Sequence, residues 1–332
     1  MTRRPSFALA VGAVAPDEWQ RALAALRIDL DAAGLTNACT LTVAAGRMPD
    51  VAAGDAVAVD LGWTDDLTTV FTGVVDAVEP GLDEVRLHAL DGGAGLLALR
   101  LDQAYERVSA GDVVRDLAGQ AGVGVGEVED GVRFPSYVVD SRRSAGQHVR
   151  SLARTCGFES YCDADNALVF RRFSRTLADH TFAYGEDVLG AALFQAEPAV
   201  GQVQVDGESP AGSEGEDAWH WLAADWSGYR GRAGSGGAAL LVRDAALRTQ
   251  AAAQAAAEAL LDDLRAAAVS GSVTVPGAPQ VRLGDAVAIR DAPAGALGAP
   301  FRVRRVRHHL TRDGGLVTRI DFTALPGAGG AP

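Results

Sequence analysis

Apolar and polar residues alternate over much of the first hundred positions of the chain. A period of two is typical of half-buried β-strands, because successive side chains point to opposite faces of a sheet. Turn residues such as Gly34, Asp50 and Pro80 separate the alternating stretches. We expect residues 1–100 to form a small antiparallel β-barrel domain with one short helix at 17–26 and strands at 8–14, 26–30, 39–43, 56–59, 71–78 and 85–89.

The periodicity changes to that of helices after residue 101. Apolar residues recur on one helical face in 109–122 and 144–157, and each segment starts at a serine suited to an N-cap, Ser109 or Ser144. Two alternating strands around a turn at 163–166 come next. We expect an inserted α+β domain over residues 101–178.

Alternating stretches return in the last part of the chain, for example "GQVQVDG" and "LVTRIDFTAL". Between them, residues 206–237 are rich in Gly, Ser and acids and predict a flexible loop, and the Ala-rich residues 243–268 predict one long helix. Its apolar stripe favours packing on the side of a β-domain; a helix on a membrane surface would need a basic face, which it lacks. We expect a second β-barrel domain over 179–325 and a loose tail over 326–332. The predicted fold is therefore mainly β with an α+β insertion.

One phrase occurs twice: "GDAVAVDL" from Gly54 and "GDAVAIRD" from Gly284. In both copies a phenylalanine, Phe71 or Phe301, follows 17 positions after the glycine and opens an alternating strand that leads into a hairpin. Chance likeness between Val- and Ala-rich strands is the alternative. The matched spacing favours two copies of one small β-domain, separated by the α+β insertion.

Charge and length narrow the function classes. A formal net charge of −13 disfavours general binding to nucleic acid or to anionic membranes, both of which reward a positive surface. No stretch is long and apolar enough for a membrane span. The apolar run "FALAVGAVA" near the N-terminus superficially resembles a signal peptide, but its alternation favours a strand. We expect a protein made in the cytoplasm without a signal peptide.

The sequence offers no pattern for catalysis, a metal or a cofactor. Its three cysteines, Cys39, Cys156 and Cys162, have no metal-site spacing and are expected to be reduced thiols. His308 and His309 are neighbours on a predicted strand and so should face opposite ways. Carboxylates are too numerous, 43 in all, for a chance pair to indicate hydrolysis. We expect no enzymatic activity, no cofactor and no metal site.

Two groups of residues are candidates for protein contacts. A basic strand near the C-terminus is either a solvated face, with a bulge at Arg304-Arg305 where the alternation slips, or a contact for an acidic partner. Aromatic residues in the loop 206–237 pack locally, lie at a protein interface or, as a third alternative, form a sugar platform. The candidate interface residues are Trp219, Trp221, Trp226, Arg302, Arg304 and Arg307.

The order of these pieces resembles the phage late control gene D family, the hub proteins of contractile tails. That family shows a helix with the pattern S-x-x-D-[VI]-[VI], a Tyr-Val strand, a helix ending in Leu-Ala-Arg-x-x-Gly-Phe-Glu, and a hairpin D-x-x-x-L-x-F-R. The matching residues here are Ser109, Asp112, Val113 and Val114; Tyr137 and Val138; Leu152, Ala153, Arg154, Gly157, Phe158 and Glu159; and Asp165, Leu168, Phe170 and Arg171. The phrases "YGEDVL" and "VPGAPQVRLGDAVAI" are also similar, so the resemblance runs from about residue 6 to residue 325.

The resemblance implies a homotrimeric baseplate hub, related to the N-terminal part of VgrG proteins. In such hubs two similar barrels per chain form a ring that adapts a hexameric inner tube to a trimeric spike. The implied partners are two further copies of the chain, a separate spike protein, an inner tube or tube-initiator protein and other baseplate proteins, all within an assembled phage-like particle. Neither nucleic-acid binding nor membrane insertion is implied.

Three alternatives stay open at this point. The hub of a non-contractile phage tail shares the same barrels. A peptidoglycan or polysaccharide hydrolase would need a cleft with a perturbed carboxylate pair. A carbohydrate-binding protein would need the three tryptophans arranged as an exposed platform.

Overall fold

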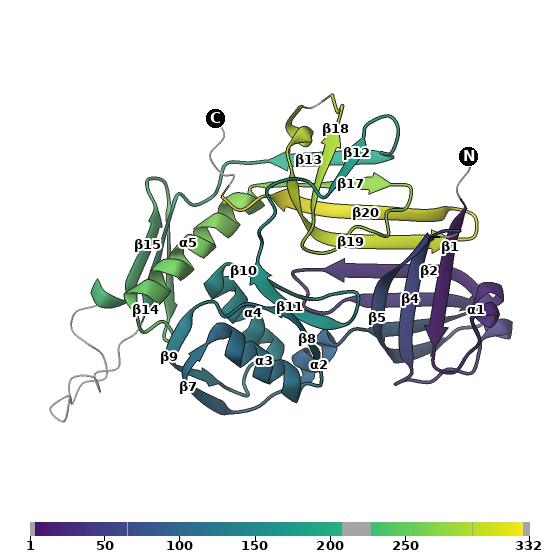
Figure 1. Ribbon diagram of the computed structural model, residues 1–332, viewed down its shortest axis with the longest axis horizontal. Helices are drawn as coiled ribbons and strands as arrows, with labels where there is room; N and C mark the ends of the chain where they lie inside the picture. The colour runs from purple at the N-terminus through teal and green to yellow at the C-terminus, as the bar shows by residue number, and fades with distance from the viewer. Residues whose placement is uncertain (1–3, 65, 208–226, 294, 328–332) are drawn as a thin grey trace.

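The computed structural model describes residues 4–64, 66–207, 227–293 and 295–327. Twelve strands form one large sheet, and eight further strands form two three-stranded sheets and one two-stranded sheet. Five α-helices lie mainly in the middle of the chain. The expected class, mainly β with an α+β insertion, is confirmed (Figure 1).

The first ninety residues form the six strands that the alternation predicts; the first lies three residues earlier than expected, and the other five are longer than expected. A short helix, α1 (Pro16–Ala22), begins at the proline and lies between the first two strands. The strands are β1 (Pro5–Val11), β2 (Leu23–Asp31), β3 (Ala38–Ala44), β4 (Ala56–Trp63), β5 (Asp66–Pro80) and β6 (Glu84–Leu90).

The α+β unit follows, and local capping explains its two main helices. Ser109 caps α3 (Ala110–Gln120) and Ser144 caps α4 (Ala145–Cys156), each in a reciprocal capping box, and Gly157 ends α4 in the left-handed conformation. Both N-caps were expected from the sequence. The remaining elements are α2 (Gly93–Ala98), β7 (Gln103–Ser109), β8 (Gly124–Val128), β9 (Arg133–Val139), β10 (Phe158–Cys162) and β11 (Ala167–Arg172).

The last part of the chain contains nine strands and the Ala-rich helix. This helix, α5, spans Gln250–Ala267 and starts later than residue 243, because residues Ala239–Asp244 form a strand and Thr249 caps the helix. The strands are β12 (His180–Ala183), β13 (Gly190–Gln195), β14 (Gln202–Gly207), β15 (Arg230–Gly234), β16 (Ala239–Asp244), β17 (Val269–Val275), β18 (Ala286–Arg290), β19 (Phe301–Thr311) and β20 (Gly315–Ala324).

The large sheet contains one six-stranded unit twice. In the first unit the strands lie in the order β1-β4-β5-β6-β3-β2, and in the second in the order β12-β18-β19-β20-β17-β13. Numbered along the chain within each unit, both orders are first, fourth, fifth, sixth, third, second. The units differ at one edge, where β1 pairs antiparallel with β4 but β12 pairs parallel with β18.

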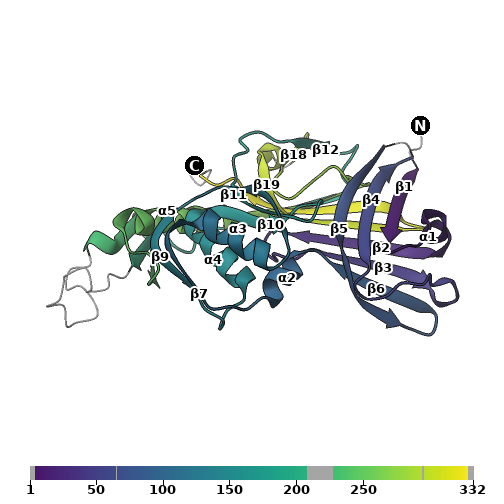
Figure 2. The same ribbon diagram turned by 60° about the horizontal axis from the view of Figure 1, so that its bottom comes forward.

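Within the described residues neither unit closes into a barrel of its own, which corrects the expectation of two separate barrels. Only Phe301 and Arg302 of β19 pair with β18, so the rest of that edge is free to take another strand. Strand β2 of the first unit takes it, pairing with β19 from Arg305 to Thr311. The two units therefore form one continuous sheet, which bends so that β1, β4 and β5 turn away from the plane of β19 (Figure 2).

Details of strand register support the duplication. Strand β5 has a bulge between Val75 and Ala77, and β19 has one at the equivalent place, between Val303 and Arg305. The second bulge confirms the expectation at Arg304-Arg305.

The two phenylalanines are not equivalent, although their spacing from the repeated glycines is equal. Phe71 pairs with Val59, whereas Phe301 pairs with Val287, the counterpart of Val57. The position equivalent to Phe301 is Gly73, which pairs with Val57. The Phe71 ring reaches over this glycine, because a Cβ there would lie 2.9 Å from the ring Cζ. The Phe71 ring therefore lies over Gly73, the position that Phe301 occupies in the second unit, although Phe71 itself is two residues earlier in the strand.

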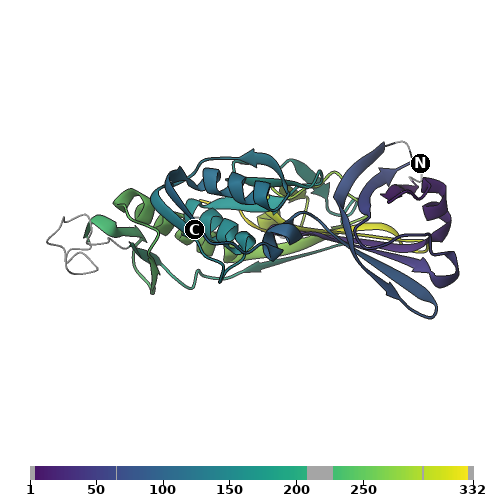
Figure 3. The ribbon, with the colours of Figure 1, turned by 90° about the horizontal axis from the view of Figure 1, so that it is seen from below.

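The α+β unit and the twelve-stranded sheet follow one another along the long axis of the molecule (Figure 3), and there are two hydrophobic cores. The first fills the inside of the twelve-stranded sheet with residues of both units. The second lies in the α+β unit and also includes residues of β14–β16 and α5, such as Val203, Val205 and Leu261. The domain boundaries at 101, 179 and 326 stay predictions; in core packing, α5 and its sheet belong with the α+β unit.

Candidate functional site

The two Gly-Asp phrases fold into the same turn. Gly54 and Gly284 both have positive φ, 96° and 82°, which an L side chain rarely adopts. In each turn the following aspartate accepts a hydrogen bond on Oδ2 from the main-chain N–H three residues earlier, at 2.9 Å for Asp55 and 2.8 Å for Asp285. The repeated words therefore encode a turn that leads into β4 in one unit and into β18 in the other.

The two turns differ in what covers them. A Cβ at Gly54 would meet nothing within 4 Å, whereas one at Gly284 would lie 2.4 Å from the Tyr161 hydroxyl. Tyr161, on β10, donates a buried hydrogen bond to the carbonyl of Leu283 at 3.0 Å. The second turn is thus the place where the α+β unit docks on the sheet.

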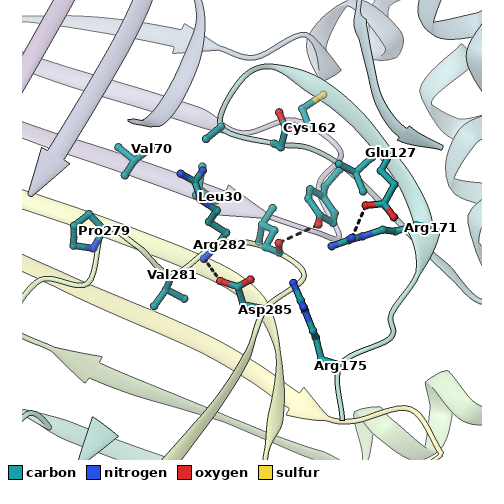
Figure 4. A pocket seen from close by; sticks show the side chains of 15 residues that line it. Leu30, Val70, Glu127, Cys162, Arg171, Arg175, Pro279, Val281, Arg282 and Asp285 are labelled. Atoms are coloured by element: carbon teal, nitrogen blue, oxygen red, sulfur yellow. Dashed lines mark hydrogen bonds and ion pairs between the residues drawn. The ribbon is translucent and has the colours of Figure 1, made fainter. Parts of the chain in front are cut away.

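A cavity of about 260 Å³ lies beside this junction, between β10, β11 and the segment before β18 (Figure 4). Two lining residues of opposite charge pair there, Arg171 with Glu127 at 2.5 Å, and Asp285 lies 3.0 Å from Nε2 of His180, just outside the lining. Because Tyr161 and Leu283, which form the buried hydrogen bond of the docked turn, also line the cavity, it is best explained as part of the joint between the two layers.

A buried ion pair reinforces the joint. The side chain of Glu159 is 1% exposed and that of Arg302 is 8% exposed, and Arg302 Nε lies 3.1 Å from Glu159 Oε1. Burial raises the pKa of Glu159, and the charge of Arg302 opposes this shift. Arg302 also lies 5.6 Å from the ring centre of Phe173. Glu159 is not among the site residues predicted from the sequence; the signal that points to it is an acid inside the short strand "FESYC".

The other arginines of the basic strand contact acids of the same chain. Arg304 is 3.9 Å from Glu159, Arg305 pairs with Asp31 on β2, and Arg307 pairs with Asp321 on β20. These contacts connect β19 to its neighbours on both sides. A further contact of Arg302, Arg304 and Arg307 with another protein stays a prediction, and the predicted contacts of Trp219, Trp221 and Trp226 lie outside the described residues.

The described residues contain no group of three or more His, Cys, Asp or Glu side chains that could hold a metal ion. His308 is buried and its neighbour His309 is exposed, as expected for adjacent strand residues. Cys39, Cys156 and Cys162 are free and buried, and burial raises the pKa of the Cys156 thiol to about 11. In the part of the chain that is described, no helix has the length and apolarity to cross a membrane.

Two carboxyls have raised pKa values. Burial raises the pKa of Asp91 to about 7 and also raises that of Glu159. Neither lines the cavity at the joint, where Asp163 and Asp285 are the aspartates. The perturbed pair in a cleft that a glycoside hydrolase requires is therefore not found at this cavity.

Free strand edges are the remaining feature. Among the described strands, β13 pairs only with β17, so its second edge is unpaired. On the edge of β5 that faces β4, the pairing ends at Val74. Two large apolar side chains are exposed near these edges, Phe194 at 65% and Leu82 at 99%. Exposed edges next to apolar side chains are typical of surfaces that bind another chain.

Comparisons with known proteins were made by sequence and by structure. No protein-family model matches the chain, and no curated protein matches it. Solved structures do match. A 43 kDa tail protein of prophage MuSo2 from Shewanella oneidensis has a TM-score of 0.73 at 15% identity, over 96% of this chain and 98% of that one.

Two further structures agree with this match. A tail protein from Neisseria meningitidis MC58 has a TM-score of 0.73 at 16% identity, over 96% of both chains. The E. coli c3393 protein, described as a component of the type VI secretion system similar in structure to the T4 tail proteins gp27 and gp5, has a TM-score of 0.60 at 11% identity, over 97% of this chain and 78% of that one. The chain therefore has the fold of phage tail proteins along nearly its whole length.

Proposed function

We propose that this chain is a structural hub protein of a phage tail or of a related contractile injection particle. Three copies form a ring that adapts a hexameric inner tube on one face to a separate trimeric spike on the other. The protein works through shape and symmetry, without a catalytic step or a cofactor. The likeness to tail proteins and to a type VI secretion component supports this class of function.

The observation that carries the proposal is the joint between the two six-stranded units. Strand β2, the second strand of the first unit, pairs antiparallel with β19, the fifth strand of the second unit. The counterparts of these strands are β13 and β5. Both have a free edge where β2 and β19 are paired. The same joint, made between copies, pairs β13 of one copy with β5 of the next.

The register of this joint follows from the duplication. Leu30 of β2 pairs with Val306 of β19. Aligning the bulge of β5 with that of β19 makes Val78 the counterpart of Val306. Following the paired residues from β5 and β19 across the next strands of each unit makes Gln195 the counterpart of Leu30. The proposed joint therefore places Gln195 of one copy opposite Val78 of the next.

The joint between copies is shorter than the joint within a copy. The counterpart of Pro80 is His308, and β19 continues for three residues beyond it, to Thr311. Pro80 has no N–H to donate, so main-chain pairing is limited to the stretch around Val78. Phe194 is next to Gln195 on β13, and Leu82 lies two residues beyond Pro80; both side chains are exposed and add apolar contact at the joint.

The number of copies comes from the resemblance to late control gene D proteins. Three chains with two units each give six similar units around one axis, which matches a hexameric tube. Three identical chains also present threefold symmetry, which matches a trimeric spike. A closed ring leaves no free sheet edge at either joint, and closure of this kind is the usual way in which a heterologous interface avoids open-ended assembly.

The mass of the purified chain tests this proposal. Native mass spectrometry is expected to show three times the 34.3 kDa mass of one chain, and class averages from electron microscopy are expected to show a ring with six similar lobes. A stable monomer at micromolar concentration, or an open chain of copies, contradicts the hub.

A further inference from the structure

A second cavity, of about 510 Å³, is lined in part by residues of β9 and α4. These two elements lie far from α1 in the molecule (Figure 1). The cavity is bordered by β9, by Arg143 before α4 and the second half of that helix, and by the end of β16 with the segment that joins it to α5. Neither the Gly-Asp joint nor the free edges of β5 and β13 contribute to it. It therefore requires an explanation other than ring formation.

Positive charge is concentrated in this cavity, although the chain as a whole is acidic. Arg143, Arg243 and Arg248 line it, against one carboxylate, that of Asp244. Asp244 already accepts a hydrogen bond on Oδ1 from the N–H of Ala246 at 2.9 Å. Among the described residues that line the cavity, arginines therefore outnumber carboxylates, in a chain whose net charge is −13.

Arg143 is held in position without being neutralised. It donates from Nη2 to Nδ1 of His148 at 3.1 Å, and the Tyr137 hydroxyl lies 3.2 Å from the same nitrogen. Because an arginine only donates, this nitrogen has to be the unprotonated one, and Nε2 of His148 then donates to the carbonyl of Asp140 at 3.2 Å. Burial lowers the pKa of His148, which favours the neutral ring. The charge of Arg143 therefore remains available to a ligand.

Arg248, in the segment between β16 and α5, is also available to bind a ligand in the cavity. Its Nε is buried and has no hydrogen-bond partner among the described residues. Within the part of the chain that the structure describes, no ion pair within 4.0 Å involves Arg248 or Arg143; Asp140, the acid nearest to Arg143 in sequence, pairs with Arg142. A buried N–H donor without a partner is unfavourable, and an anion that enters the cavity can accept a hydrogen bond from it.

The shape of the cavity favours an extended chain over a small ion. Ser136, Tyr137 and Val138 are consecutive in β9 and all line the cavity. Successive side chains of a strand alternate between faces, so three in a row indicate that β9 turns its backbone edge toward the space. Within the described residues β9 pairs only with β7. An added strand can use that free edge, as in recognition by β-augmentation.

We propose that this cavity binds an extended acidic segment of a partner protein. The main chain of the segment pairs with the free edge of β9, and its carboxylates contact Arg143 and Arg248. Charge-assisted hydrogen bonds from arginine to carboxylate supply the specificity. The site does not depend on the trimer, so it can be tested whether or not the ring forms.

Fluorescence anisotropy on the full chain tests the site with the labelled peptide acetyl-Asp-Val-Asp-Val-Asp-Val-amide. Two matched peptides serve as references: one with Asn in place of Asp, and one with N-methylated valines, which cannot donate to a strand edge. The acidic peptide is expected to bind about tenfold more tightly than the Asn reference, since one charge-assisted hydrogen bond is worth that much. It should also bind more tightly than the N-methylated reference, which keeps the charges but loses the main-chain hydrogen bonds of strand pairing. Equal affinity for the Asn peptide contradicts the charge contacts, and equal affinity for the N-methylated peptide contradicts the pairing with β9.

Variants locate the binding to the cavity. Arg143→Gln with Arg248→Gln is expected to weaken binding of the acidic peptide by about tenfold or more. Arg150→Gln with Arg154→Gln removes the same charge from exposed positions on α4 that do not line the cavity, and it should leave the affinity unchanged. Equal losses in both double variants indicate general electrostatics and overturn the site. Inorganic phosphate that binds as tightly as the peptide also overturns it, in favour of a small-anion site.

Circular dichroism and a charge-conserving variant distinguish loss of binding from loss of folding. Circular dichroism of each double variant should match that of the parent chain. Arg143→Lys with Arg248→Lys keeps the charge but loses the planar donor group, and is expected to bind with an intermediate affinity. If the lysine variant binds no better than the glutamine variant while both stay folded, the carboxylate contacts are contradicted.

Discussion

Tyr161 and Leu283 come from different layers of the protein, and the hydroxyl of the first donates to the carbonyl of the second at 3.0 Å. Leu283 immediately precedes Gly284, so the bond fixes the α+β unit to the second of two identical turns. The first turn, at Gly54, has no such cover. The repeated Gly-Asp sequence therefore forms an uncovered turn at Gly54 and a turn that contacts the α+β unit at Gly284.

Alanine substitutions at the two glycines should separate backbone strain from packing. Gly54→Ala introduces strain alone, because its φ is positive but its surroundings are open. Gly284→Ala adds a clash with Tyr161 and is expected to lower the free energy of unfolding by about 1–3 kcal/mol more than Gly54→Ala. Urea denaturation of both variants measures the difference. Equal losses would show that the docking of Tyr161 contributes nothing.

The buried pair of Glu159 and Arg302 should behave as a unit. Arg302→Met leaves Glu159 buried without its main counter-charge and is expected to cost about 3–5 kcal/mol. Adding Glu159→Gln to that variant removes the uncompensated charge, so the double variant should be more stable than Arg302→Met alone. A double-mutant cycle by urea denaturation measures the coupling. Additive losses would contradict a direct interaction.

His308 gives the protein a predictable response to acid. Burial lowers its pKa in the folded chain to about 4, whereas in the unfolded chain the value is about 6.5. The unfolded state therefore binds the proton first, and stability falls as the pH drops from 6.5 toward 4. Between pH 7 and pH 5 the parent chain should lose about 2 kcal/mol more than His308→Gln. Identical pH profiles of the two chains would show that His308 titrates normally.

Local features of the fold could be predicted from the sequence because they depend on neighbours along the chain. The caps at Ser109 and Ser144 need only the next turn of helix, and the bulge at Arg304 follows from a slip in alternation. Contacts between distant segments could not be predicted. The partner of Arg302 is Glu159 and that of Arg305 is Asp31, and each pair joins segments that only the folded topology brings together.

Only part of the correspondence between the two Gly-Asp copies could be predicted from the sequence. The sequence correctly predicts equivalent turns at Gly54 and Gly284, since both depend on a glycine with positive φ and an aspartate after it. The equal spacing to Phe71 and Phe301 predicts an equivalence that the strand register does not have. Strand pairing, rather than spacing along the chain, decides which residues correspond. For the same reason the joint of β2 with β19 could not be foreseen.

The proposed ring predicts one specific neighbour relationship between copies, Gln195 opposite Val78. Paired strand residues lie about 5.5 Å apart at Cα or closer, which is within reach of a disulfide. The double variant Gln195→Cys, Val78→Cys should therefore form disulfides under mild oxidation. The native cysteines are buried and should not compete.

The most direct test of the hub is the product of that oxidation on a non-reducing denaturing gel. The account predicts a covalent species of three chains that reverts to one chain on reduction, while each single-cysteine variant and the pair Gln195→Cys, Thr72→Cys, whose second position already pairs with β4, remain uncrosslinked. A double variant that stays monomeric on the gel, or that crosslinks no more than these controls, would contradict the joint of β13 with β5 and the ring built from it.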